Sequence, residues 1–429
     1  MFDFVKRCKN SVKHAESRDF MTTERIYRED PYVAECVSEV VGIREKGGKD
    51  IIECRTSVFY PEGGGQPSDT GTVSVAGRLY EVTSAHDEGL EGPVWHYTDA
   101  PAGTFSAGDE VVLAIDWDQR FSNMQRHLGE HMLSGTFYSL LGGVNKGFHM
   151  GEDYVTIDID LGGRMLTEEE LDLAGQHVNM AIWADLPVTV TWFDDYESSR
   201  VMPVRKEVPH DGRVSVVTVG NLPDPHDCIA CCGTHPSSSG QVGLVSIYKC
   251  EPNKGMNRVF FDCGRKALER LNADSKMLTD ISRRYSCKTA DIMSRLDTES
   301  ENISSLKGRL SSLSSYAAER EKASILEELS ASDDSVYTYS SELFSADELL
   351  KLGFAVAAEA SGKLLILMQP EAKTCILISS GEQKCGKLVK ENVQTYNGRG
   401  GGRDDNARAL FTSEKDMKDF ARALTEMVK

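Results

Sequence analysis

The chain has 429 residues, of which 40% are hydrophobic, and its formal net charge is −19. This length allows about two to four domains with sizeable cores, and so acidic a chain must hold any nucleic acid through local basic patches. The sequence has no apolar run long enough to cross a bilayer, no apolar stretch near its N-terminus, and eleven cysteines at irregular spacing. These features exclude a disulfide framework and a membrane partner, and predict a cytoplasmic protein with reduced thiols.

The first part of the chain is predicted to be a short extension followed by a β domain. Residues 1–21 are mostly polar, and we treat them as an extension of uncertain role. Within residues 22–115, alternating segments such as YVAECVSEVVGI and EVVLAID are separated by glycines. This pattern is typical of a small antiparallel β-barrel or sandwich. The same domain contains the glycine-rich segment EGGGQ, which by itself is also compatible with a plain turn.

Residues 116–264 are predicted to form an α/β domain around a helix that carries two histidines. His127 and His131 are four residues apart, so on a helix both imidazoles lie on one face, as two ligands of one metal ion require. The same spacing also arises by chance on long helices. Thr167 and Glu170 form the capping box of a second helix. The segments YVTIDID, LPVTVTW, VSVVTV, LVSIYKCE and RVFFDCG predict strands, which together indicate an α+β sheet with helices on one side.

The segment CCGTH supplies a second pair of ligand-type residues at the same spacing. Cys231 and His235 are four residues apart, and with the two helical histidines they make three imidazoles and one thiolate. This donor set suits tetrahedral zinc rather than magnesium or calcium. Cys232 is a second possible thiolate, and the spacing to His235 only weakly favours Cys231. The simpler alternative is that these cysteines are small buried residues. We predict one zinc ion per chain.

The C-terminal half is predicted to hold a helical segment and a small domain. Residues 265–330 contain few glycines and show a heptad-like apolar seam, which predicts a helical hairpin or coiled coil whose partner helix lies within the chain or across a homodimer. Its apolar positions are Ile292, Leu296, Ile303, Leu306, Leu310, Leu313 and Ala317. Residues 331–429 predict a small α/β domain for tRNA binding or oligomerisation. Six basic residues there (Lys384, Lys387, Lys390, Arg399, Arg403 and Arg408) outnumber the four neighbouring acids.

Five segments in this order resemble the alanyl-tRNA editing proteins, which are free-standing relatives of the editing domain of alanyl-tRNA synthetase. They are FYPEGGGQPSDTG, HLGEH, FHMGEDYVTIDID, CCGTH and GMNRVFFDCG. A further segment, GRGGGRDDNARA, resembles the C-terminal domain of the synthetase and indicates the long form of the family, although Asp404 stands where proline is usual. The resemblance implies hydrolysis of tRNA(Ala) mischarged with serine or glycine.

The resemblance also implies roles for particular residues. The zinc ligands would be His127, His131, Cys231 and His235. Gly63, Gly64 and Gly65 would line the pocket for the aminoacyl ester and the terminal adenosine, and Gln66 and Ser57 would be catalytic. Gln66 would line the same pocket, and Ser57, where many relatives have threonine, would sense the serine side chain. Leu128 replaces a common threonine, which would alter the pocket wall.

Two chemical routes remain open for such a site. Zinc lowers the pKa of a bound water toward ~7 and polarises an ester, but with four protein ligands the water must be a fifth ligand or displace one. Alternatively, zinc anchors the amino acid while Gln66 and the loop amides position the water. Either route suits an aminoacyl ester, which is already activated.

Two other classes of protein share parts of this pattern. HLGEH is also H-x-x-E-H, the signature of inverted zinc proteases, in which Glu130 would be the general base and a downstream acid such as Glu207 the third ligand. That interpretation leaves CCGTH and FYPEGGGQ unexplained. A non-catalytic tRNA-binding protein with structural zinc is the other alternative, because four protein ligands are typical of structural sites.

Overall fold

The computed structural model describes residues 23–207 and 212–428, and the chain divides into two compact units, residues 1–279 and 280–429. The predicted extension of residues 1–21 lies outside the described residues. No helix of the described part is long and apolar enough to cross a membrane.

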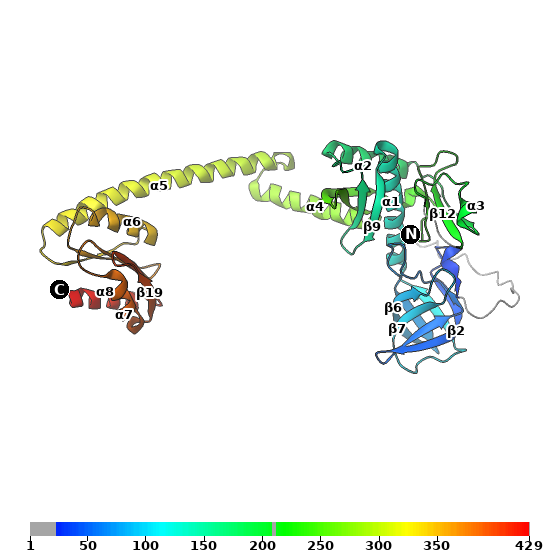
Figure 1. Ribbon diagram of the computed structural model, residues 1–429, viewed down its shortest axis with the longest axis horizontal. Helices are drawn as coiled ribbons and strands as arrows, with labels where there is room; N and C mark the ends of the chain where they lie inside the picture. Colours follow the sequence, from blue (N-terminus) through cyan, green and yellow to red (C-terminus); the bar gives the residue numbers. More distant parts are fainter. Residues whose placement is uncertain (1–22, 208–211, 429) are drawn as a thin grey trace. The chain divides into compact units, whose positions relative to one another are not determined.

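Six antiparallel strands of the first unit close into a barrel in the order β2-β3-β7-β6-β5-β8 (Figure 1). Side chains alternate between the inside and the outside, so that in β8 Val111, Leu113 and Ile115 are buried. The barrel predicted from the alternating segments is confirmed. Its strands are β2 (Glu35–Lys46), β3 (Lys49–Cys54), β5 (Gly71–Val75), β6 (Arg78–Asp87), β7 (Val94–Pro101) and β8 (Glu110–Ile115). Two short strands, β1 (Glu24–Arg25) and β4 (Thr56–Ser57), pair with each other outside the barrel order. A 3-10 turn, Ile26–Arg28, follows β1.

Helix α1 (Trp117–Leu141) follows the barrel and is buried along most of its length. It begins at Asp116, whose side chain accepts a hydrogen bond from the backbone N–H of Gln119, and it ends at Gly142 in the left-handed conformation. The helix packs on a four-stranded antiparallel sheet, β14-β15-β10-β9. A Cβ atom at Gly129 would lie 2.2 Å from Cys263 Sγ, so only glycine allows this close approach. The strands are β9 (Val144–Met150), β10 (Val155–Asp160), β14 (Val245–Asn253) and β15 (Met256–Cys263).

Helix α2 (Glu168–Trp183) covers the same face of that sheet as α1. Ala174, Val178 and Ile182 share one hydrophobic core with α1 and with β10 and β15. The predicted capping box is present: Thr167 and Glu170 exchange side-chain-to-backbone hydrogen bonds. A separate three-stranded sheet contains β11 (Val188–Phe193), β12 (Val214–Val219) and β13 (Asp227–Ala230), with the short helix α3 (Tyr196–Ser199) and the 3-10 turn Ser239–Val242 nearby in the chain. The expected sheet with helices on one side is observed for β10, β14 and β15, but the single sheet is corrected to two, because β11 and β12 pair with β13 and not with the other predicted strands.

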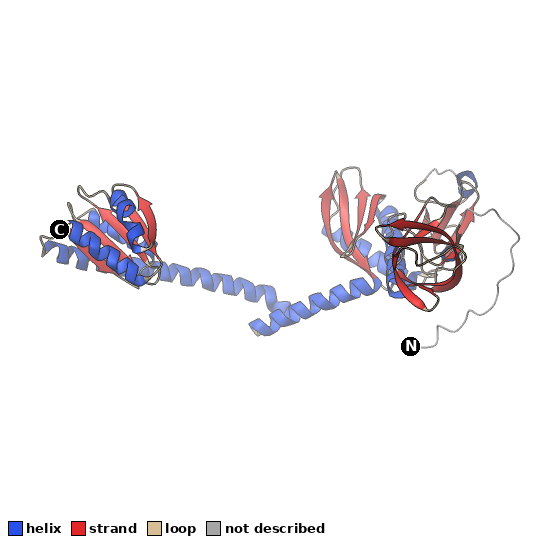
Figure 2. Ribbon diagram, turned by 90° about the horizontal axis from the view of Figure 1, so that it is seen from below, coloured by secondary structure: helices blue, strands red, loops and turns tan. Residues whose placement is uncertain are grey.

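The second unit contains a five-stranded sheet with helices on both faces (Figure 2). Leu364 and Ile366 of one strand face α7 and α8, whereas Leu365 and Leu367 face α6 and the end of α5. The strands, in spatial order, are β16 (Val336–Ser340), β17 (Leu364–Gln369), β18 (Thr374–Ser379), β20 (Asn406–Phe411) and β19 (Gly398–Gly402). The helices are α6 (Ala346–Ala357), α7 (Cys385–Asn392) and α8 (Glu414–Val428), and Val393–Tyr396 is a 3-10 turn.

The segment predicted as a helical hairpin or coiled coil is helical. Helix α4 (Gly264–Tyr285) and helix α5 (Ile292–Ser330) are separated by a turn that contains Thr289–Asp291. Most of the predicted seam on α5 is exposed: Leu306, Leu310 and Leu313 are each more than 60% accessible. Leu310 and Leu313 line a surface hollow together with Leu343 and Phe344 but stay largely exposed, so a partner helix for the seam remains a prediction. The last turns of α5 do pack, through Ile325 and Leu329, on α6.

Candidate metal centre

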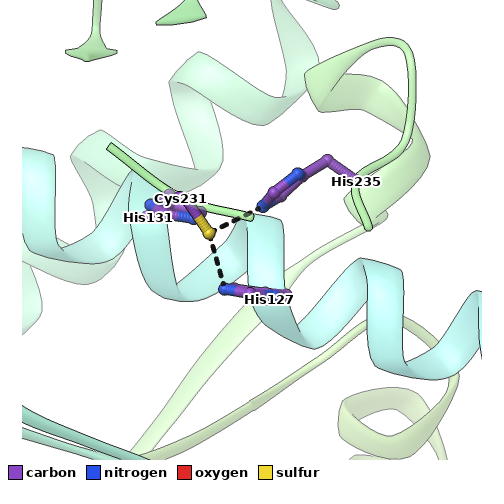
Figure 3. Close-up of side chains that lie close together, drawn as sticks. All are labelled: His127, His131, Cys231 and His235. Carbon is purple, nitrogen blue, oxygen red and sulfur yellow. Dashed lines mark hydrogen bonds between the residues drawn. The ribbon is translucent and has the colours of Figure 1, made fainter. Parts of the chain in front are cut away.

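Four side chains from two distant segments meet on the buried face of α1 (Figure 3). His127 and His131 come from α1, and Cys231 and His235 come from the loop after β13. Their ligand atoms all lie within 4.8 Å of one another. The Sγ atom of Cys231 is 3.3 Å from Nε2 of His127 and 3.7 Å from Nε2 of His235. The structure thus brings together the whole predicted set, and Cys231, not the exposed Cys232, completes it.

The loop reaches α1 because Gly233 has no side chain. A Cβ atom there would lie 2.2 Å from Cε1 and 2.4 Å from Nδ1 of His127. Strand β13 brings the loop to this place by pairing with β12, and Ser215 Oγ fixes its start by donating to the carbonyl oxygen of Cys231. The glycine in CCGTH is therefore needed for the two ligand pairs to meet.

The side chains of the cluster shift one another's pKa values, and they do not all shift toward the forms that bind a metal. Burial by itself raises the pKa of Cys231, but the surrounding imidazoles outweigh it and hold that pKa well below its usual value. Burial lowers the pKa of His235 to about 4, against the attraction of the thiolate. Burial lowers the pKa of His131, but the Cys231 thiolate and the side chains of Asp227 and Glu130 outweigh it and raise that pKa to about 10. Cys231 is thus a thiolate and His235 a neutral imidazole, the forms in which both bind metals, whereas His131 must give up a proton to bind one.

The residues present fit a zinc ion. Both ring nitrogens of His131 are buried, and neither has a hydrogen-bond partner among the described residues. Buried polar atoms are normally satisfied, so an unpaired nitrogen inside a group of ligand atoms is a place for a metal. One thiolate and three imidazoles at these separations form the soft, nitrogen-rich donor set that zinc prefers.

Gln66 of the glycine-rich loop lies behind His127. Its Oε1 atom is 2.8 Å from His127 Nδ1 and also accepts a hydrogen bond from the backbone N–H of Thr234. Its Nε2 atom donates to Thr234 Oγ1 at 2.8 Å. Both ends of the buried Gln66 amide are thus engaged in hydrogen bonds, and Gln66 fixes the ring orientation of His127. This geometry supports a positioning role for Gln66 rather than a role in holding water.

The three glycines next to Gln66 border the cluster. Gly64 and Gly65 have positive φ angles, and a Cβ atom on Gly65 would lie 2.4 Å from the ring of Phe148. That ring stacks on His127 with 5.4 Å between centroids. A Cβ atom on Gly64 would lie 3.9 Å from Cys232 Sγ, next to the ligand Cys231. Gly63 closes the loop through backbone hydrogen bonds with Gln66.

Ser57 does not join this group. Its side chain is fully buried beside the barrel strands, where its hydroxyl pairs with His96 Nε2 at 2.8 Å and accepts a hydrogen bond from the backbone N–H of Phe59. The hydroxyl therefore has no access to a ligand in this arrangement, and the structure does not support the serine-sensing role. Leu128 also lies elsewhere than expected, in the hydrophobic core between α1 and the sheet and not in a pocket wall.

The carboxylates of the protease interpretation do not belong to the cluster. Oε1 of Glu130 accepts hydrogen bonds from Ser134 and Asn145, and its Oε2 lies 3.7 Å from the Nδ1 atom of His131, so the carboxylate is beside one histidine but is not one of the four grouped side chains. Glu207 is exposed and lies beside Tyr196. The third and fourth ligands come from CCGTH, so the H-x-x-E-H assignment is wrong for this site.

Sequence analysis missed polar residues around the second histidine. Asp227 and Arg205 are buried close to His131, and they come from β13 and from the loop after α3. No spacing pattern links them to His131, because the three residues lie in separate segments. A surface cavity of about 40 Å³ lies beside the cluster and is lined by Cys231, His235 and Trp192 among others.

Two parts of the chain match known sequence families. Residues 6–119 match the family described as tRNA synthetases class II (A), and residues 214–260 match the family described as threonyl and alanyl tRNA synthetase second additional domain. The second match contains Cys231 and His235. It therefore covers half of the proposed ligand set.

Similar proteins extend this result over most of the chain. An alanyl-tRNA editing protein, AlaX-L of Pyrococcus horikoshii, is 27% identical and is aligned over 92% of this chain and 96% of its own length. The alanine–tRNA ligases of Pyrococcus abyssi and Archaeoglobus fulgidus are 29% and 28% identical. The chain spans 44% and 46% of those ligases. The resemblance inferred from the five motifs is confirmed.

Proposed function

We propose that the protein hydrolyses the aminoacyl ester of tRNA(Ala) mischarged with serine or glycine. One observation carries this proposal: His127, His131, Cys231 and His235 meet beside the glycine-rich loop, in a chain similar over most of its length to an alanyl-tRNA editing protein. An activated ester needs only a delivered water and stabilisation of the developing oxyanion. The proposed activity belongs to the cytoplasm, where tRNA is charged.

Zinc is the metal we propose, with one ion per chain. When bound, it supplies a Lewis acid that polarises the ester and lowers the pKa of water toward ~7. The chain's own contribution is to present the Cys231 thiolate and three imidazoles and to hold the His127 ring through Gln66. Gly63, Gly64 and Gly65 are proposed to contact the ester and the terminal adenosine from the loop that borders the cluster.

A purely structural zinc is the alternative, since four protein ligands fill a tetrahedral shell. The cavity of about 40 Å³ beside Cys231 and His235 has room for about one water molecule, the reactant that hydrolysis needs next to the cluster. Discrimination would follow the rule that a site built to hydrogen-bond a hydroxyl rejects an analogue that lacks it. Correctly charged alanine would then be spared.

The C-terminal half is proposed to bind tRNA without taking part in the chemistry. Among the six basic residues noted in the sequence, Lys384, Lys387 and Arg408 form ion pairs with nearby acids. Lys390, Arg399 and Arg403 form none within the described residues, so they are available for phosphate groups. The exposed seam of α5 is proposed to pair with a second copy of the chain.

Deacylation of Ser-tRNA(Ala) tests the function. We expect hydrolysis of Ser-tRNA(Ala), little hydrolysis of Ala-tRNA(Ala), and loss of activity in His131→Ala, and the same assay with Gly-tRNA(Ala) decides whether a substrate without a hydroxyl is also accepted. Absence of deacylation by zinc-loaded protein would support the structural alternative. Peptidase activity that depends on Glu130 would support the protease alternative.

A further inference from the structure

Two buried carboxylates lie close to the Nδ1 atom of His131. His131 Nδ1 is 3.6 Å from Asp227 Oδ2 and 3.7 Å from Glu130 Oε2. His131 Nδ1 and Asp227 Oδ2 are both buried, and the structure gives neither a hydrogen-bond partner within its described residues. A donor and an acceptor without partners therefore face each other at slightly more than hydrogen-bond distance.

The two carboxylates are held in different ways. Oδ1 of Asp227 accepts a hydrogen bond from Nε of Arg205 at 2.6 Å, and both side chains are almost fully buried. Glu130 is held through Oε1 by Ser134 and Asn145, and its oxygen lies 3.9 Å from Arg205. The short ion pair fixes Asp227 by one oxygen and leaves the other free for His131. Asp227 is thus the better placed acceptor.

We infer that Asp227, fixed by Arg205, is a positioning residue that accepts the Nδ1 proton of His131 and so presents Nε2 of this ring to the metal. A histidine ligand commonly donates its second N–H to a carboxylate, which selects the tautomer and makes the ligand nitrogen more basic. His127 is held in the same way by a neutral amide, that of Gln66. The two histidines of α1 thus have different partners: the partner of His127 is a neutral amide, and the partner of His131 is a carboxylate.

The inference rests on the proposed metal site but not on the proposed substrate. The decisive measurement is the zinc affinity of the full chain, obtained by competition with a chelator, for the wild type and Asp227→Asn. We expect zinc binding to weaken by about 10- to 100-fold, the range typical for loss of such a partner. Cobalt-loaded protein gives a second readout, because its visible spectrum reports whether coordination remains tetrahedral.

The matched control is Asp262→Asn. Asp262 is an equally buried carboxylate that pairs with Arg126 on the same helix, through contacts of 2.8 and 3.0 Å, and it is not part of the ligand group. Both variants break a buried ion pair and should lower the melting temperature of the metal-free protein. Only Asp227→Asn should weaken zinc binding. If both variants bind zinc like the wild type, Asp227 is structural and the inference is wrong.

Two further variants keep the test decisive. Glu130→Gln should weaken zinc binding less than Asp227→Asn, and the reverse order would assign the proton to Glu130 and overturn the inference. If Asp227→Asn does not fold, the Arg205→Lys variant is measured in its place. We expect Arg205→Lys to bind zinc more weakly than the wild type, and unchanged zinc binding would contradict the role of Asp227. A wild type that binds no zinc refutes the site and the inference together. A wild type that binds zinc but leaves Ser-tRNA(Ala) intact refutes only the proposed function.

Discussion

Replacing Gly233 with alanine should separate the two pairs of metal ligands. The added Cβ atom would lie 2.2 Å from His127 Cε1, whereas an ordinary contact begins near 3.4 Å, so the loop or the ring must move by 3.4 − 2.2 = 1.2 Å. The obstacle is the ring of a ligand, itself held from behind by Gln66. Metal–ligand distances tolerate only about 0.2 Å, so such a movement cannot preserve all four bonds.

The expected loss of zinc affinity in Gly233→Ala follows from the strain that the added methyl group causes. Overpacking costs about 1–3 kcal/mol. If this strain falls on the zinc-bound state, zinc affinity drops by roughly 5- to 150-fold, since 1.4 kcal/mol is tenfold. Chelator competition measures this change, and deacylation of Ser-tRNA(Ala) at limiting zinc should fall in parallel.

Gly175→Ala is the matched substitution. At this position in α2 the nearest atom to an added Cβ is Ile247 Cδ1 at 3.8 Å, which is an ordinary contact. Alanine should stabilise the helix slightly and leave zinc binding unchanged. If Gly233→Ala binds zinc as tightly as the wild type, the proposed need for glycine at this position is refuted, because the loop would then have moved without affecting the ligands.

Three other outcomes are expected. Glu130→Gln should lower the rate of Ser-tRNA(Ala) deacylation by at most about tenfold, because the carboxylate is not one of the four grouped side chains. Loss of a general base would instead lower the rate by ~10² to 10⁴-fold. A loss beyond roughly a thousandfold with zinc still bound would contradict the expectation. Burial lowers the pKa of His96 to about 4, so its neutral ring stabilises the fold fully above pH ~6.5 and this contribution, about 3 kcal/mol, is lost as the pH falls toward 4. Urea denaturation of the metal-free protein should show this fall in the free energy of unfolding between pH ~6.5 and about 4 for the wild type, and a smaller fall for His96→Gln. An equal pH dependence in the two proteins would rule out the role of His96. A chain ending at Thr279 should still hydrolyse Ser-tRNA(Ala) with a higher KM and a weaker dependence on salt, and unchanged KM and salt dependence would show that the second unit does not bind tRNA.

The buried polar residues explain why the candidate site joins several parts of one unit. Gln66 comes from a loop of the barrel region, the two histidines from α1, and Cys231 from the loop after β13. A second buried ion pair, Arg120 with Asp69, ties α1 to the same barrel loop. Loss of this pair would therefore be expected to displace Gln66 relative to His127.

Local patterns in the sequence predicted much of this molecule. Alternating apolar residues predicted the barrel, because period-two burial is a property of each strand by itself. The i,i+4 spacing placed His127 and His131 on one face of a helix, and Thr167 and Glu170 marked where α2 begins. Residue chemistry alone indicated zinc, since three imidazoles and a thiolate are a characteristic donor set.

Only the tertiary structure decided which residues surround the metal ligands. Cys231 and Cys232 are adjacent in sequence, and the direction of the loop after β13 decides which sulfur faces the histidines. Ser57 is only nine residues from Gln66, yet its hydroxyl is buried against His96 while Gln66 reaches His127. Asp227 meets His131 because β13 passes α1. Such contacts join segments far apart in the chain, and they depend on how strands and helices pack rather than on any local periodicity.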